Sequence, residues 1–263
     1  MGLFPTDRWL EQDEGEPLQL CARFVPFFDD ASARDIYRYL CLYGMYRNAR
    51  QAVRLLPDMK AQRLWERVGR YYGWQRTTWG GPDVPVFLLP ADDENPKLAR
   101  EFHGKGGVAF ADKLFFFLLP GHRDDEIAAL VAHEYNHVYR LQNLPNGGKE
   151  ATLLDAVMME GLAEHAVAET VGPGQCASWT AYYTDRELEK FWRRCIAPNQ
   201  DVPVSHPLSV RILYGLGWYP KMVGYAVGHA IVRRCLERGH SLTKLMAMEA
   251  KQIAALAGFE AGQ

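Results

Sequence analysis

Apolar residues recur at three- and four-residue spacing through much of the N-terminal part of the chain. One run extends from Ser32 to Leu56 and is followed by Pro57, and a second extends from Met59 to Tyr72. This spacing places apolar side chains on one face of a helix, so both runs are predicted to be helical, with Pro57 ending the first. We interpret residues 1–63 as an N-terminal helical segment.

The pattern changes after Trp74, where short aromatic and β-branched runs lie between glycines and prolines. Two runs have this character, Asp83–Leu89 and Gly107–Leu119, and Asp112-Lys113 can form a turn inside the second. Such runs are typical of buried strands. They predict a small sheet between the N-terminal helices and the rest of the chain.

Helical spacing then returns and continues to the end of the chain. The predicted helices cover residues 124–142, 152–171, 178–196, 221–238 and 241–257, and Asn146-Gly147-Gly148 separates the first two. We therefore predict an α+β fold that is predominantly helical, with the small sheet packed on the helix at 124–142. In this interpretation residues 64–263 form one domain, or the whole chain is one continuous domain.

The composition excludes several classes of protein. The 263 residues are 48% hydrophobic and 24% charged, with 30 Lys and Arg against 32 Asp and Glu and a formal net charge of −2. This balance excludes a disordered or collagen-like chain, and the charge leaves no basic field for nucleic acid or an anionic membrane surface. The most apolar stretch, Leu114–Leu119, is far shorter than the roughly 20 residues that a bilayer requires. We expect neither a nucleic-acid nor a membrane partner.

The cysteines and the N-terminal segment indicate in which cellular compartment the protein is expected. The five cysteines are widely spaced and include no C-x-x-C pair, a pattern typical of free thiols in a reducing environment. The segment MGLFPTDRWLEQDEGEP lacks the basic stretch and apolar run of a signal peptide. A cytoplasmic location is therefore expected.

Residues 133–137 carry the most informative pattern, H-E-x-x-H, inside the predicted helix at 124–142. His133 and His137 lie one helical turn apart and about 40° around the axis, so both imidazoles can reach one cation. Glu134 is close enough to accept a proton from a metal-activated water. These residues predict a zinc site with Glu134 as general base. The alternative is a helix whose two histidines are surface or core residues.

A catalytic zinc ion usually takes three protein ligands, so a third is expected. The next predicted helix begins at Thr152 and Asp155, which resemble a capping box, and carries Glu160 and Glu164 among apolar residues. Buried carboxylates are costly without a cation or a histidine partner. We assign Glu160 as the third ligand, and Glu164 as the acceptor that orients a ligand imidazole. Alternatively, either glutamate faces water.

Hydrolysis of a carbonyl also requires a donor that stabilises the oxyanion. Tyr225 and His229 lie one turn apart on the predicted helix at 221–238, and we assign this role to Tyr225 before His229. A core tyrosine is an equally good interpretation of Tyr225. The other candidates for this role are Tyr214, Tyr219 and His240.

The predicted sheet offers a place for a peptide or protein substrate. We expect an extended peptide to lie along an edge formed by Val108–Phe110, where main-chain hydrogen bonds can hold it. The preceding Gly106-Gly107 pair lets a backbone come close. Purely structural glycines would have the same pattern.

Three segments resemble the YjaZ-like family of predicted zinc-dependent proteases, formerly a domain of unknown function. They are HEYNHVYRLQNL, TLLDAVMMEGLAEHAVAE and GWYPKMVGYAVGHAIVRRCLE, and the likeness spans about Leu64–Leu256. An H-E-x-x-H helix followed by a glutamate helix is the gluzincin pattern, of which thermolysin-type peptidases are the model. The resemblance implies a zincin-like domain, peptidase activity, a Zn²⁺ cofactor, Glu134 as general base, and three ligands: His133, His137 and Glu160.

One position departs from the thermolysin pattern. Met159 stands where those enzymes carry an asparagine that orients the second histidine. The orienting partner of His137 must therefore come from elsewhere or be absent.

The sequence thus predicts a cytoplasmic zinc metallopeptidase, and two alternatives remain. A zinc hydrolase acting on a non-peptide amide can use the same ligand set. An inactive relative can bind a metal or a partner protein through the same groove. The sequence leaves the substrate and the oligomeric state open.

Overall fold

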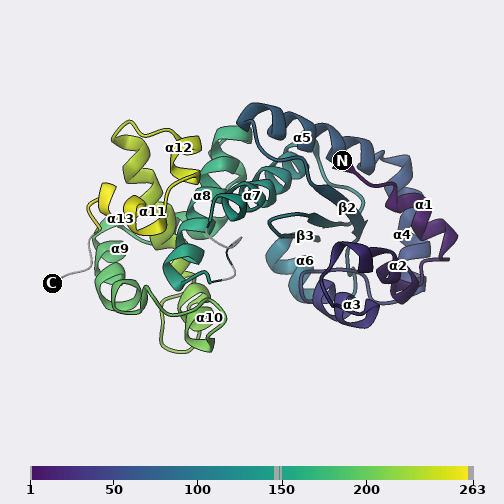
Figure 1. The fold of residues 1–263 in the computed structure, drawn as a ribbon, viewed down its shortest axis with the longest axis horizontal. Coiled ribbons are helices and arrows are strands. Elements are labelled where there is room, and N and C mark those ends of the chain that lie inside the picture. The colour runs from purple at the N-terminus through teal and green to yellow at the C-terminus, as the bar shows by residue number, and fades with distance from the viewer. Residues whose placement is uncertain (1, 145–147, 149, 260–263) are drawn as a thin grey trace. The chain divides into compact units, whose positions relative to one another are not determined.

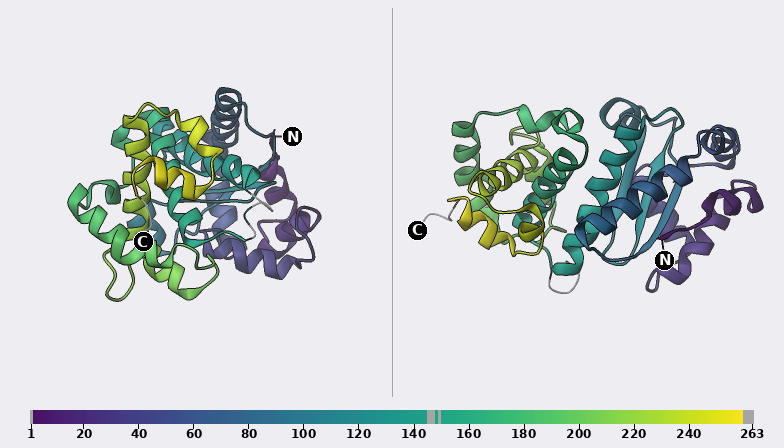
Figure 2. Two further views of the ribbon diagram at one scale, coloured as in Figure 1. Left: turned by 60° about the vertical axis from the view of Figure 1, so that its left-hand side comes forward. Right: turned by 90° about the horizontal axis from the view of Figure 1, so that it is seen from above.

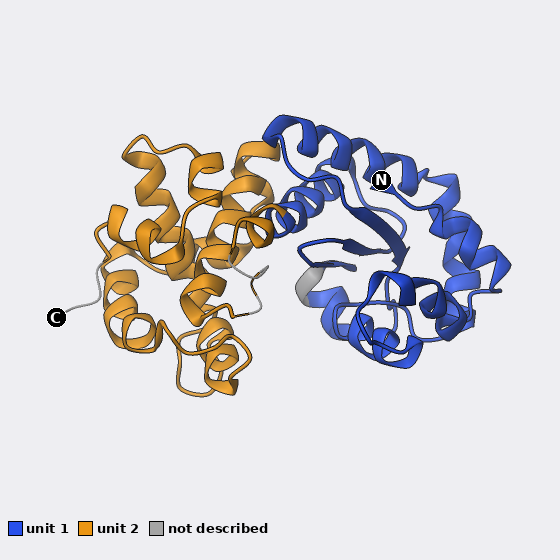
Figure 3. Cartoon of the chain, viewed as in Figure 1, with its two compact units in different colours: residues 1–138 blue, residues 139–263 orange. Residues whose placement is uncertain are grey.

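The computed structural model describes residues 2–144, 148 and 150–259. Asn146 and Gly147 of the predicted break lie outside these residues. The chain forms two compact units, residues 1–138 and residues 139–263 (Figure 3). The predicted boundary between residues 63 and 64 stays a prediction, whereas the predominantly helical α+β class is confirmed.

A four-stranded mixed sheet lies at the centre of the first unit (Figure 1). Its order is β1-β2-β4-β3, with β1, β2 and β4 parallel and β3 antiparallel to β4. A turn connects β3 to β4 close to the predicted position, but it is formed by Ala111 and Asp112, because Phe110 N donates a hydrogen bond to Lys113 O and so pairs Lys113 with Phe110. β1 has two residues, too short for a pattern to reveal it. The strands are β1 (Gly2–Leu3), β2 (Pro85–Pro90), β3 (Lys105–Ala109) and β4 (Leu114–Leu118).

Helices cover both faces of this sheet (Figure 2). On one face Phe24 packs against Phe87 of β2 and Phe115 of β4, with ring centroids 4.9 and 5.2 Å away. On the other face Tyr135 packs against Tyr72 and Trp79. The helices of this unit are α1 (Thr6–Gln12), α2 (Pro17–Phe24), α3 (Ala33–Leu42), α4 (Ala49–Ala61), α5 (Leu64–Trp79), α6 (Pro96–Phe102) and α7 (Asp124–Asn143), whose last turn extends into the second unit.

The single helix predicted from Ser32 to Leu56 is wrong, because the chain forms α3 and α4 there. Gly44 adopts a positive φ of 112° between them, and the Asn48 side chain accepts a hydrogen bond from Gln51 N and so starts α4. Pro57 lies inside α4 and does not end it. Apolar spacing does not reveal the break, because apolar residues continue at helical spacing on both sides of it.

Within its described residues, the second unit consists of helices joined by turns and loops, with one isolated β-bridge between Thr152 and Pro203. The predicted helices at 152–171 and 221–238 are confirmed as α8 and α11, and the capping box of Thr152 and Asp155 is present. The runs at 178–196 and 241–257 are each divided into shorter helices, and α10 was not predicted. The α-helices are α8 (Leu153–Val171), α9 (Asp185–Phe191), α10 (Pro207–Tyr214), α11 (Val223–Glu237), α12 (Leu242–Met246) and α13 (Ala250–Leu256).

Short 3-10 and π turns link these helices. They are Pro173–Gln175, Ser178–Ala181, Trp192–Ile196 and Ala197–Asn199. Among the described residues, no helix is both long enough and apolar enough to cross a bilayer.

Two glycines let α8 and α11 pack backbone against backbone. A Cβ on Gly228 would overlap the carbonyl of Val157, and a Cβ on Gly161 would overlap the backbone of Gly228. Protein interiors are packed too densely to absorb an added methyl group at such a contact. The two glycines therefore fix how α8 is held against α11.

Replacing Gly228 with alanine tests this contact. We expect G228A to lower the free energy of unfolding by about 2 kcal/mol, because overpacking outweighs the better helix propensity of alanine. Urea denaturation followed by circular dichroism measures the change. Gly174 is a matched control, because a Cβ there meets no described atom within 4 Å. Equal stability of G228A and G174A would contradict the close contact.

Candidate metal centre

Charged contacts at its N-terminus position helix α7. Asp124, Asp125 and Glu126 occupy its first turn, where carboxylates are favoured by the helix dipole. The Asp124 carboxylate also accepts hydrogen bonds from Arg67 and Arg70 on α5, at 2.7 and 3.1 Å. The helix that carries residues 133–137 is thereby attached to its neighbour within the first unit.

The other end of α7 is held by a buried cation. Arg140 is fully buried, and its Nη1 donates to the carbonyls of Met246 and Met248 at 3.3 and 2.9 Å. Burial lowers the pKa of Arg140 to about 10, so the guanidinium stays charged at neutral pH. A cation is favourable beside these carbonyls, because Met246 is the last residue of α12 and Met248 lies just beyond that C-terminal end.

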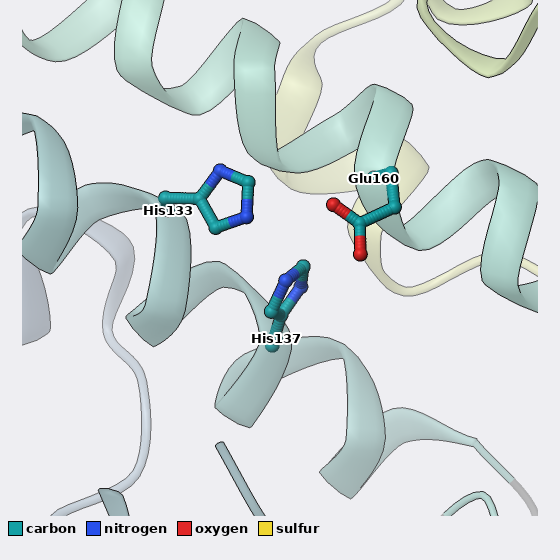
Figure 4. Close-up of side chains that lie close together, drawn as sticks. All are labelled: His133, His137 and Glu160. Atoms are coloured by element: carbon teal, nitrogen blue, oxygen red, sulfur yellow. The ribbon is translucent and has the colours of Figure 1, made fainter. Parts of the chain in front are cut away.

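His133 and His137 face the same side of α7. Their ring centroids are 4.7 Å apart, with the ring planes at 79°. One ligand-type atom from each histidine and one from Glu160 of α8 all lie within 4.8 Å of one another (Figure 4). Among the described residues, His133, His137 and Glu160 are the cluster of His, Cys, Asp or Glu side chains that is close enough together to hold a metal ion. The structure thus brings together the three side chains that the sequence predicted as ligands.

Glu134 lies between α7 and strand β3. Its side chain is buried, and a Cβ on Gly107 would come within 2.5 to 2.8 Å of its Cγ, Cδ and Oε1 atoms. A larger residue at position 107 would force the Glu134 side chain to move, which accounts for one glycine of the Gly106-Gly107 pair. The second glycine has another neighbour, since a Cβ on Gly106 would lie 2.5 Å from the Tyr43 carbonyl oxygen. The sequence predicted a close approach here, but not the groups that approach.

Tyr225 contacts the predicted ligand Glu160. Burial raises the pKa of Tyr225 well above its ordinary value, and the charge of Glu160 and hydrogen bonds to Tyr214 and Glu160 raise it further. The hydroxyl is therefore protonated at neutral pH and can donate a hydrogen bond. The sequence placed Tyr225 and Tyr214 among the candidates for the oxyanion donor, but it did not reveal their contact with each other or with Glu160.

His229 has a different environment from Tyr225. Its ring stacks on His165, with centroids 4.2 Å apart and planes at 5°, and it also lies near Trp179. Burial, and to a lesser degree the neighbouring His165, lowers the pKa of His229 to about 4. His229 is therefore uncharged at neutral pH. Its assignment to catalysis stays a prediction.

Glu164 is buried on α8 and accepts a hydrogen bond of 2.8 Å from the backbone N–H of Ala177. This bond attaches α8 to the segment that follows it. The predicted contact of Glu164 with a ligand imidazole stays a prediction, as does the partner that orients His137.

Comparison with known proteins identifies the family. Residues 64–255 match the family model described as "Predicted Zn-dependent protease (DUF2268)". The chain is also 36% identical over 246 residues to "Uncharacterized protein YjaZ" of Bacillus subtilis (strain 168), which covers 92% of this chain and 94% of that protein. The relative thus extends into the N-terminal helices, which the family model leaves out. No solved structure is significantly similar to the chain. The chain therefore belongs to the YjaZ-like family of predicted zinc-dependent proteases.

Proposed function

We propose that this protein is a zinc-dependent peptidase of the gluzincin type. The observation that carries the proposal is the convergence of one atom each from His133, His137 and Glu160 within 4.8 Å, in a chain whose family is described as a predicted Zn-dependent protease. Glu134, the proposed base, directly follows the ligand His133 and lies three residues before His137. Together these features support hydrolysis of a peptide bond.

The proposed ligand set fits zinc in its chemistry. Two imidazole nitrogens and one carboxylate oxygen are the donors found at catalytic zinc sites, where a fourth position remains for water or substrate. Hard cations such as Mg²⁺ and Ca²⁺ prefer oxygen ligands alone. Bound there, zinc supplies Lewis acidity, which makes a water molecule nucleophilic at neutral pH and polarises a carbonyl.

Glu134 is proposed to move the proton. As a carboxylate it accepts the proton that the attacking water loses, and it then donates that proton to the departing amine. Its contact with Gly107 restricts the side chain to one region beside β3. A restricted base needs little reorganisation during the reaction. The close glycine is therefore part of the proposed machinery.

The substrate is proposed to bind as an extended peptide along β3. This strand is the end of the sheet order among the described residues. Hydrogen bonds from Leu119 N to Gly104 O and from Phe110 N to Lys113 O show that the backbone groups of even-numbered residues point toward β4. By alternation, those of Gly107 and Ala109 point away from β4. A peptide that pairs there passes Glu134, which favours a peptide over a small amide as substrate.

The first test is metal content. We expect the purified chain, loaded with zinc and then dialysed, to retain one zinc ion per chain by inductively coupled plasma mass spectrometry. H133A and E160A should lose at least about tenfold in zinc affinity, because a ligand is missing. E134Q is the matched control, since it keeps all three ligands and should keep zinc. A folded chain that retains no zinc would rule out the proposed site.

The second test is cleavage of peptides. The zinc-loaded chain should cleave members of a random peptide library, with products read by mass spectrometry. E134Q should lose at least about 100-fold in kcat/KM, because no other group is proposed to take the proton. Equal cleavage by the chain and by E134Q would assign the activity to another site. Cleavage of small amides without any peptide cleavage would favour the non-peptide hydrolase.

Tyr225 is proposed to stabilise the oxyanion, and its contact with Glu160 suggests a competing role in positioning that ligand. If Tyr225 donates to the oxyanion, Y225F should lower kcat by about 100-fold and leave zinc affinity unchanged. If it positions Glu160, Y225F should weaken zinc binding. Steady-state kinetics at saturating zinc and a zinc titration separate the two roles, and kinetics and zinc affinity like those of the unsubstituted chain would exclude both.

A further inference from the structure

An exposed apolar surface lies beside β3, on the face opposite Glu134. It consists of the exposed residues Tyr39, Leu42 and Tyr43 and of the half-buried Phe110, and we call it the α3 ledge. Leu42 is 80% exposed, and Tyr39 and Tyr43 are 37% and 40% exposed. Tyr39 contacts Tyr43 and Phe110, with ring centroids 5.0 and 5.7 Å apart. Large contiguous patches of exposed apolar residues are typical of binding sites, whereas single exposed apolar residues are common on any protein surface.

The ledge continues the buried face of helix α3. Ile36 and Leu40 point into the core, and helical spacing places Tyr43, then Tyr39, then Leu42 progressively further around the helix. The apolar side of α3 is thus wider than the part of it that the first unit buries. Its outer part, around Leu42, has exposed apolar area that a ligand can cover.

The ledge is continuous with the strand that the substrate is proposed to follow. The Tyr43 carbonyl oxygen lies against Gly106, and Phe110 directly follows β3. In the register of β3 with β4, Gly106 and Val108 share one face and Gly107 has the other. The ledge therefore adjoins the face of Gly106 and Val108, whereas Glu134 adjoins the face of Gly107.

Strand alternation then decides which substrate residue reaches the ledge. A peptide paired to β3 directs its side chains alternately to the two faces, in step with the residues of β3 opposite them. The peptide residue opposite Gly107 points to the Glu134 face. The residues next to it in the peptide sequence, opposite Gly106 or Val108, point to the face of the ledge.

We propose that the α3 ledge selects peptides with a large apolar side chain at a position adjacent to the residue that faces Glu134. This proposal rests on the proposed function and names its substrate class. Aromatic and leucine side chains on the ledge bind such a residue by burying apolar surface. The residues Tyr39, Leu42 and Tyr43 lie in the N-terminal helices, outside residues 64–255 that match the family model, so this chain's selectivity comes in part from a segment beyond that model.

Binding to an inactive chain tests the proposal without catalysis. Fluorescence anisotropy measures binding of labelled extended peptides to the zinc-loaded E134Q chain, using peptides that differ only in Leu or Ser at alternate positions. We expect the Leu peptides to bind at least about tenfold more tightly, and L42S on the E134Q background to reduce this preference severalfold. Equal binding of Leu and Ser peptides to E134Q, or an unchanged preference in the L42S chain, overturns the proposal.

A charge substitution provides a gain of selectivity. L42K places a cation at the C-terminal end of α3, where it suits the helix dipole, and should shift preference from Leu toward Asp or Glu peptides. W74S is the matched control, because Trp74 is 47% exposed on α5 and lies outside the ledge. It should leave the preference unchanged, and a shift as large as that of L42K would overturn the proposal.

Cleavage sites separate this proposal from the proposed function. Digestion of the library by the unsubstituted chain should favour Leu next to the cleaved bond. Digestion by L42K should shift this preference toward Asp or Glu, as in the binding measurements. Cleavage that depends on Glu134 but has the same preference in both chains contradicts the ledge alone. Absence of zinc or of Glu134-dependent cleavage contradicts the proposed function, while the same anisotropy measurements on E134Q without zinc still test the ledge.

Discussion

The contact between Glu134 of α7 and Gly107 of β3 is the constraint on which the proposed chemistry depends. A side chain at residue 107 would occupy the space of the Glu134 carboxylate, so the glycine lets the helix and the strand come close. The same contact brings the proposed base next to the backbone groups that can pair with a peptide. Base and substrate strand are therefore placed by one packing interaction, while His133 and His137 follow from their position on the same helix.

A second close contact, between α8 and α11, has the corresponding effect in the other unit. Gly161 and Gly228 let these helices pack at backbone distance, and this packing brings Tyr225 of α11 to Glu160 of α8. The buried hydroxyl stays protonated and can donate to the carboxylate. In each unit, considered by itself, glycine thus lets a neighbouring element come close to a glutamate-bearing helix.

We propose that one face of the sheet serves catalysis and that the other face serves substrate selection. The face toward α7 carries the base, and the face toward α3 presents the apolar ledge. Because a strand alternates its side chains, a peptide at the edge meets both surfaces at neighbouring residues. Chemistry and selectivity would then be separable, since substitutions on α3 leave Glu134 and the three proposed ligands unchanged.

The sequence by itself determined the features that depend on local spacing. The helical placement of His133 and His137, the glutamates of α8, the hairpin around Asp112-Lys113 and the fold class follow from periodicity and residue type, because each concerns residues within a few turns or one hairpin. Periodicity failed where apolar residues keep a helical spacing across a break between two helices, as at α3 and α4. Only the tertiary structure decided that Gly107 faces Glu134, that Tyr225 reaches Glu160, and that α3 lies beside β3, because these contacts join residues far apart in the chain and depend on packing that no local pattern records.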